Sequence, residues 1–244
     1  MTRPNTKGFS LSFLKLAPLA VISVLAACAQ KTPPPPPPPV VVIPPQPQPP
    51  MGAPLNMRIP EAADDGTRKT VNSSVSTAQA VWNLRSAYNV AALNCVEPEY
   101  APILAGYKDF LKVHDKSLDK ANAELTKNFN GAFGKSGTRE RETYQTQVYN
   151  FFAVPPVKST FCNAALALAT EIAAVPAGQI EGYAPQGLAK IEAPFMAFFD
   201  AYDQYRADLA AWQAKYGGIV VVAPDQARNT TTTARPGPPA VQPQ

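Results

Sequence analysis

The sequence predicts an all-α fold, a bundle of four to five helices, with segments of different character at both ends of the chain. Apolar residues recur every three or four positions through most of residues 77–216, which is the spacing of a buried helix face. No segment alternates apolar and polar residues for long enough to require a sheet. Most of the 28 prolines of the 244-residue chain lie near its two ends, so one compact domain is expected between them.

The N-terminal segment combines a basic start with a short apolar run. Arg3, Lys7 and Lys15 precede a run that extends from residue 16 to residue 27, and no acidic residue occurs before Glu61. The run is too short to cross a bilayer as a permanent helix. This charge asymmetry is typical of a secretory signal.

The apolar run ends in Leu25-Ala26-Ala27-Cys28, in which two small residues precede a thiol. This ending resembles the lipobox of bacterial lipoprotein precursors. The resemblance implies that residues 1–27 are a signal peptide removed by cleavage, and that Cys28 carries a diacylglycerol on sulfur and usually a further acyl chain such as palmitate. Two or three acyl chains attach a protein stably to a membrane, whereas one gives marginal binding. The alternatives are an ordinary secreted protein in which Cys28 is incidental, or a chain that is retained as a signal anchor.

The residue after the cysteine is Ala29 and not aspartate. In the sorting pattern of enteric lipoproteins, this choice implies transfer to the outer membrane. We therefore expect the mature protein in the cell envelope, anchored through its lipid to the periplasmic face of the outer membrane.

Residues 28–56 are expected to form the lipidated cysteine and a proline-rich tether. Seven consecutive prolines occupy positions 33–39, and six more follow before residue 57. Proline lacks an amide donor and fixes φ, so this segment is expected to be polyproline II and to act as a spacer. The alternative is a docking ligand for the aromatic groove of a partner, because polyproline II is a preorganised recognition shape.

The body begins with an irregular lead-in over residues 57–76, in which Asp64-Asp65-Gly66 is a turn signal. A helical bundle domain is expected over residues 77–216. Its predicted helices are Thr77–Asn94, Ala101–Phe129, Thr138–Phe152, Lys158–Ala174 and Gln186–Tyr216, the last bending at Pro194. Residues 131–137 are expected to be a loop, and the Thr- and Pro-rich tail, residues 217–244, is expected to be disordered.

A row of lysines runs along the polar face of the second predicted helix, at Lys108, Lys112, Lys116 and Lys120. Such a row is able to meet anionic headgroups or cell-wall carboxylates. Acidic residues lie among the lysines at pairing distance, which favours a solvated surface.

Two cysteines remain once lipid is attached to Cys28, namely Cys95 and Cys162. An even pair in an oxidising compartment predicts a disulfide. Two buried free thiols are the alternative.

The charge balance gives no reason to expect nucleic acid as a partner. Of the 22 Lys and Arg residues, three precede Cys28, which leaves 19 against 18 Asp and Glu in the mature chain. Binding to nucleic acid requires many cationic contacts to phosphate.

No catalytic constellation stands out. The lone histidine, His114, excludes a multi-histidine metal site, and neither a metal nor a cofactor is expected. His114 falls on an apolar helix face, so a hydrogen-bonded core or interface imidazole is expected. Glu97 and Glu99 flank Pro98, and they are able in principle to act as an acid and base pair.

These observations predict a non-enzymatic lipoprotein whose helical module binds another envelope protein or the cell wall, or has a structural role. One alternative is an envelope hydrolase that uses Glu97 or Glu99 with His114. Another is a carrier of apolar ligands, in which aromatic residues of the last helix line a cavity.

Overall fold

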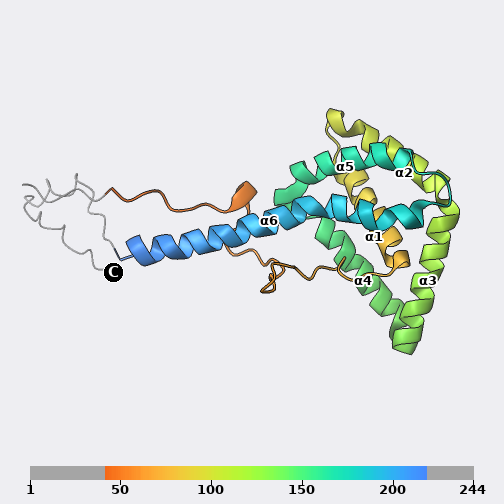
Figure 1. Cartoon of the computed structure of the whole chain (residues 1–244), viewed down its shortest axis with the longest axis horizontal. Coiled ribbons are helices and arrows are strands. Elements are labelled where there is room, and N and C mark those ends of the chain that lie inside the picture. Colours follow the sequence, from red (N-terminus) through yellow and green to blue (C-terminus); the bar gives the residue numbers. More distant parts are fainter. Residues whose placement is uncertain (1–41, 219–244) are drawn as a thin grey trace, which may run out of the picture. The chain divides into compact units, whose positions relative to one another are not determined.

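The structure, a computed structural model, describes residues 42–218, and from Ile43 onward these belong to one compact unit. Cys28 and the predicted signal peptide lie outside the described residues, as does nearly all of the predicted tail. The α-helices are α1 (Thr77–Asn94), α2 (Ala101–Val113), α3 (Asp115–Phe133), α4 (Gly137–Phe152), α5 (Lys158–Ala173) and α6 (Ile180–Tyr216). There are also four short 3-10 helices in this range: η1 (Pro50–Gly52) precedes α1, whereas η2 (Pro98–Tyr100), η3 (Gly134–Ser136) and η4 (Pro155–Val157) connect consecutive α-helices. Within this range there is no strand, which confirms the all-α prediction (Figure 1).

Helix α1 occupies the centre of the bundle, because it packs against each of the other five α-helices. Its first turn is closed by a capping box, in which Ser76 accepts from the amide of Gln79 and the Gln79 side chain accepts from the amide of Ser76. Buried residues occur on all sides of α1, among them Val81, Leu84 and Tyr88. A helix surrounded by others needs no polar face, which explains this distribution.

The prediction of one helix over residues 101–129 is wrong, since His114 breaks it into α2 and α3. His114 has φ −108° and ψ 16°, outside the helical region. The apolar spacing continues across the break, from Phe110 to Leu118, so the sequence pattern does not reveal it. The break lets α2 pack against α5 while α3 packs against α4 and α1. Counted as one bent segment, α2 and α3 bring the bundle to the predicted five helical segments.

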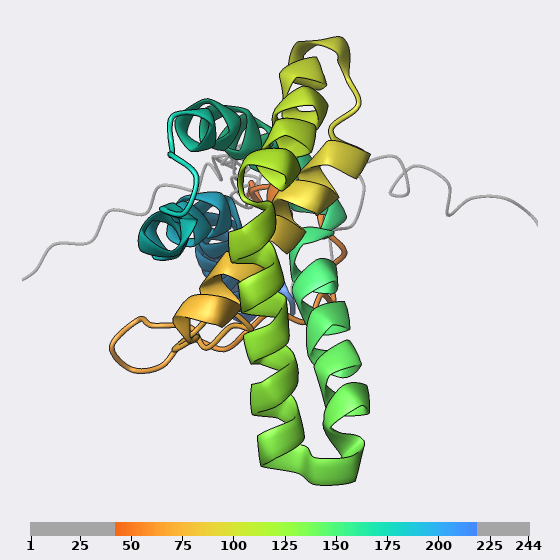
Figure 2. The same ribbon diagram turned by 90° about the vertical axis from the view of Figure 1, so that its right-hand side faces the viewer.

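Helices α3 and α4 form a long hairpin (Figure 2). The loop predicted over residues 131–137 is wrong, because α3 continues to Phe133 and α4 already begins at Gly137. The reversal between them is the single turn η3. Its first residue, Gly134, has φ +54°, a conformation that favours glycine.

Helix α6 begins six residues before the predicted start, and it continues through Pro185 and Pro194. Ile180 and Ala184 are fully buried on the same stripe as Leu188, so core contacts hold the first turns in spite of the proline. The C-terminal part of α6 extends beyond the other helices (Figure 1), accompanied by the proline-rich segment.

Candidate binding surfaces

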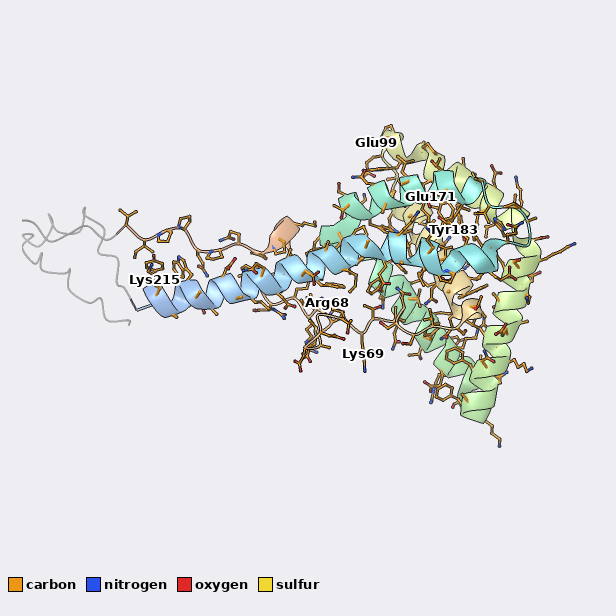
Figure 3. All side chains as sticks on the ribbon, viewed as in Figure 1. Arg68, Lys69, Glu99, Glu171, Tyr183 and Lys215 are labelled. Atoms are coloured by element: carbon orange, nitrogen blue, oxygen red, sulfur yellow. A yellow bond between two sulfur atoms is a disulfide. The ribbon has the colours of Figure 1, made fainter. Side chains whose placement is uncertain are left out.

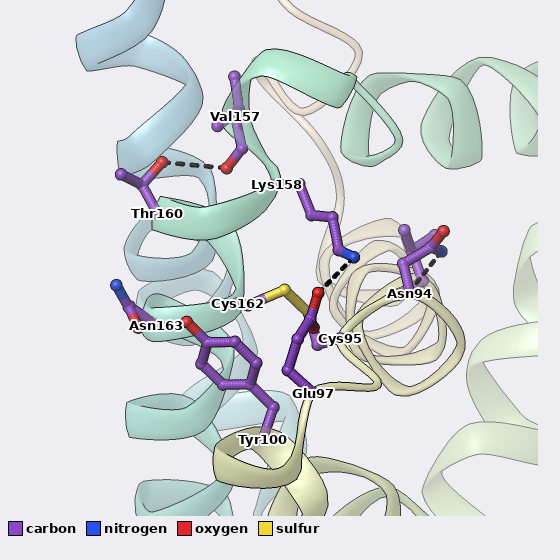
Figure 4. The surroundings of a disulfide bond; sticks show 10 residues. Asn94, Cys95, Glu97, Tyr100, Val157, Lys158, Thr160, Cys162 and Asn163 are labelled. Atoms are coloured by element: carbon purple, nitrogen blue, oxygen red, sulfur yellow. Dashed lines mark hydrogen bonds and ion pairs between the residues drawn. A yellow bond between two sulfur atoms is a disulfide. The ribbon is translucent and has the colours of Figure 1, made fainter. Parts of the chain in front are cut away.

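The predicted disulfide between Cys95 and Cys162 is present, and both cysteines are buried. Cys95 follows the last residue of α1, and Cys162 lies in the second turn of α5, with 5.6 Å between their Cα atoms (Figure 4). The Tyr100 hydroxyl donates to Asn163 Oδ1 at 2.8 Å, which joins the same two parts of the chain. The disulfide therefore fastens the C-terminal end of the central helix to α5.

The structure does not bring together the three residues predicted for a hydrolase. Glu97 pairs with Lys158, whose Nζ lies 2.7 Å from Oε1, and this hydrogen bond holds the pKa of the Glu97 carboxyl below its ordinary value. Glu99 lies in η2, ahead of α2 (Figure 3), whereas His114 follows the last residue of α2. The 13 residues of α2 separate them by roughly 20 Å at the rise of an α-helix.

His114 is 2% exposed, so its predicted place in the core is confirmed. The predicted hydrogen bond is not formed at Nδ1, which is buried without a partner in residues 42–218. The ring instead packs against Phe110, with 5.3 Å between ring centres. Burial lowers the pKa of the imidazole, and the nearby charge of Glu181 opposes this effect. The environment therefore favours a neutral ring over a cation.

Five aromatic side chains of α6 are buried in the interior of the bundle, namely Phe195, Phe198, Phe199, Tyr202 and Tyr205. Phe195 meets Phe151, Phe152 and Phe161 with ring centres 5.1–5.5 Å apart, which joins α4, α5 and α6 in one aromatic cluster. The contacts of Phe195 with Phe152 and Phe161 are edge-to-face, an arrangement that is favourable beyond the area that it buries.

Residues 44–57, which we call the strap, lie along the C-terminal part of α6 (Figure 1). Trp212 Nε1 donates to the carbonyl of Pro44 at 2.9 Å, and Tyr202 Oη donates to the carbonyl of Pro54 at 2.6 Å. The amide of Met57 donates back to Tyr202 Oη at 2.9 Å, and Arg206 Nη2 donates to the Met57 carbonyl at 2.7 Å. Proline residues have no amide hydrogen, so a proline-rich segment binds mainly through its carbonyl groups.

The strap includes residues 44–56 of the predicted tether, so this part of the tether is fastened to α6 at Pro44 and Pro54. The prediction left open whether the proline-rich segment is a spacer or a ligand. In the part that the structure describes, it binds Tyr202 and Trp212 of its own chain, and binding to a partner stays a prediction.

The lead-in that follows the strap is held by a buried arginine, Arg68, whose side chain is 3% exposed (Figure 3). Its Nη2 atom lies 2.8 Å from Asp200 and 2.6 Å from Asp203, both on α6, and its Nη1 atom donates to the carbonyl of Pro60. The predicted turn at residues 64–66 is present, with Gly66 at φ +80°. Arg68 thus fastens an irregular segment to the same helix that holds the strap.

The predicted lysine row is divided by the break at His114, so its members do not share one helix. Lys112 pairs with Asp109 at 3.6 Å, and Lys120 with Glu181 at 3.5 Å. These lysine side chains are well exposed, as expected of a solvated surface with weak ion pairs.

At least three surface hollows of the described residues are large enough to receive a small ligand, and one of about 520 Å³ lies between the end of α5 and the start of α6. An apolar hollow of about 490 Å³ lies between the strap and η4. Its lining residues are Met51, Gly52, Pro54, Met57, Pro155 and Pro156. A polar groove of about 520 Å³ lies between the first turn of α1, α3 and the first turn of α6, and is lined in part by Thr77, Ser117, Lys120 and Glu181.

In residues 42–218, no group of three or more His, Cys, Asp or Glu side chains is placed to hold a metal ion. None of the described helices is, by itself, both long enough and apolar enough to cross a membrane. One bent pair, Asp115–Phe152 with Pro155–Ala173, meets the criteria of length and composition together. Comparisons of the chain with protein-family models, with curated proteins and with solved structures find no match.

Proposed function

We propose that this protein is a lipid-anchored lipoprotein of the cell envelope, whose helical body is a non-enzymatic binding or structural module in the periplasm. The anchor is assigned to Cys28 because Leu25-Ala26-Ala27-Cys28 resembles a lipobox. The disulfide supports a location outside the cytosol, since such bonds persist in oxidising compartments. Since the residue after Cys28 is Ala29 and not aspartate, the sorting pattern of enteric lipoproteins assigns the anchor to the outer membrane.

The strap is the observation that carries this proposal. The chain that follows the lipidated cysteine reaches the body at the C-terminal end of α6, where Trp212 holds Pro44. The 13 residues between Cys28 and Val42 reach at most about 40 Å as polyproline II, at 3.1 Å per residue. Hydrogen bonds then hold the strap against several turns of α6. This arrangement suits a module held at a set distance from a membrane. Its partner is another envelope protein or the cell wall.

Replacing the lipid acceptor tests the anchor. The Cys28→Ser variant is expected to lose metabolic labelling by palmitate and to move from the membrane fraction to the soluble periplasmic fraction. The matched control is the double variant Cys95→Ser, Cys162→Ser, which removes the other two cysteines and is expected to retain both the label and the membrane association.

The opposite pattern contradicts the proposal. A Cys28→Ser protein that still incorporates palmitate and sediments with membranes would mean that another residue or segment provides the anchor.

A further inference from the structure

Two arginines and a tryptophan form a cluster where α1 meets α4. Trp82 and Arg85 lie on α1, and Arg141 lies on α4. The guanidinium carbon of Arg85 is 4.9 Å from the centre of the Trp82 ring, and that of Arg141 is 6.0 Å from it. All three side chains are half-buried, and so they are accessible to a ligand.

The hydrogen-bond partners of both guanidinium groups are neutral. Arg85 Nη1 donates to Tyr149 Oη at 3.1 Å, and Arg141 Nη2 donates to Asn122 Oδ1. With its amide oxygen facing the cluster, Gln145 accepts from Trp82 Nε1 at 2.8 Å and from Arg141 Nη2 at 3.3 Å.

Within residues 42–218, neither guanidinium has a carboxylate oxygen within 4.0 Å. Arg68, Arg139 and Arg206 differ in this respect. Arg68 pairs with Asp200 and Asp203, and Arg139 pairs with Glu140 at 2.9 Å. The cluster therefore holds two positive charges that no neighbouring side chain in this range neutralises.

The donors of the cluster are also incompletely used. A guanidinium has five N–H donors, and the contacts above use one or two at each arginine. Arg141 Nε is buried and has no partner within the described residues. A partly buried cation gains more from a counter-charge than an exposed one, because water screens the attraction less. The planar fork of a guanidinium matches the two oxygens of a carboxylate or phosphate group.

We propose that Arg85, Trp82 and Arg141 form a binding site for an oxyanion, a carboxylate or phosphate group of a ligand outside the described chain. The two guanidinium groups supply charge and paired N–H donors, and the indole ring holds both in place through cation–π contacts. The site is independent of the lipid anchor, so it stands or falls separately from the function proposed above.

The test uses the fluorescence of Trp82. The chain has two tryptophans, so Trp212→Phe leaves Trp82 as the sole indole, and the mature full-length chain in detergent is titrated in this background. Sodium phosphate and sodium succinate are the two probes, with sodium chloride keeping the ionic strength constant. We expect a saturable change in emission with at least one probe. A response to phosphate alone, to succinate alone or to both identifies which oxyanion the site accepts.

Matched variants decide whether the two arginines are responsible. Arg85→Gln and Arg141→Gln are each expected to raise the half-saturating concentration about tenfold or more, because each removes charge-assisted hydrogen bonds. Arg85→Lys keeps the charge without the planar fork and is expected to weaken binding as well. The control, Arg139→Gln, removes an arginine on α4 that pairs with Glu140, and it is expected to leave binding unchanged.

Circular dichroism and thermal melts of each variant show whether it is folded. The proposal is overturned if neither probe gives a saturable change, or if the folded Arg85→Gln and Arg141→Gln proteins bind as the parent does. It is also overturned if Arg139→Gln weakens binding as much as they do.

Discussion

The hydroxyl of Tyr88 meets the backbone of α2 at Gly106, and this contact explains why position 106 is a glycine. Tyr88 is fully buried on α1, and its hydroxyl has no hydrogen-bond partner in the described residues. A Cβ atom at position 106 would overlap this hydroxyl. Burial, together with the charge of Asp109, raises the pKa of Tyr88 to about 12, so the phenol remains neutral at ordinary pH.

We predict that Gly106→Ala destabilises the protein by about 1–3 kcal/mol, because the added methyl group overpacks the interface. Elsewhere in a helix interior, the same substitution normally stabilises by roughly 1 kcal/mol. Tyr88→Phe removes a buried hydroxyl that is not hydrogen-bonded, so it is expected to cost little. In the Tyr88→Phe background, Gly106→Ala should therefore become neutral or stabilising.

Denaturant unfolding of the four proteins in this double-mutant cycle measures the coupling between the two positions. Equal destabilisation by Gly106→Ala in both backgrounds would show that the hydroxyl is not the cause.

At the scale of the elements, the strap depends on the hydroxyl group of Tyr202. This group joins two strap residues at once, since it donates to the Pro54 carbonyl and accepts from the Met57 amide. The neighbouring Tyr205 is also buried on α6, but its hydroxyl has no partner in the part of the chain that the structure describes. The two tyrosines therefore form a natural comparison.

We predict that Tyr202→Phe loosens the strap by about 1–3 kcal/mol, the cost of leaving the partly buried Pro54 carbonyl and Met57 amide without their partner. Tyr205→Phe should have almost no effect on the strap. Native-state hydrogen exchange of the amides around Met57 measures the opening of this segment. Equal protection of these amides in the two variants would contradict the role assigned to Tyr202.

The sequence predicts helices well where the ends carry local signals, and less well elsewhere. The bounds of α1 were predicted correctly, because Ser76 and Gln79 form a capping box at its start. The early start of α6 was missed, because a proline such as Pro185 is unfavourable in a helix interior, and the buried contacts of Ile180 that stabilise this turn are tertiary. The break at His114 has no signal in the apolar spacing, because its cause is the different packing partners of α2 and α3.

At the scale of the whole molecule, the disulfide closes a long loop. Cys95 and Cys162 are 67 residues apart, and the loop contains α2, α3 and α4. We predict that the double variant Cys95→Ser, Cys162→Ser loses about 4 kcal/mol of unfolding free energy, because the unfolded chain regains the entropy that closure removes. Denaturant unfolding of the parent protein and of the double variant measures this difference. A loss below about 1 kcal/mol would mean that the crosslink contributes little beyond the packing around it.

As with the fold, those parts of the candidate sites that join distant positions of the sequence could not be predicted from it. The Cys95–Cys162 pair was predictable, because these two cysteines remain once Cys28 is set aside as the predicted lipid acceptor. The strap was not, since Pro44 and Trp212 are 168 positions apart and no local pattern joins them. The cluster around Trp82 was missed for the same reason, because Arg141 reaches it from a different helix.

The direction of the strap has a mechanical consequence. Residue 44 lies beside residue 212 and residue 54 beside residue 202, so the strap runs antiparallel to α6. A pull on residue 42 along the helix axis, away from the body, therefore strains both attachment points together, as in an overlapped joint under shear. A pull perpendicular to the helix axis instead breaks the hydrogen bond at Pro44 first and the one at Pro54 afterwards. The same hydrogen bonds thus resist lengthwise tension more strongly than transverse tension.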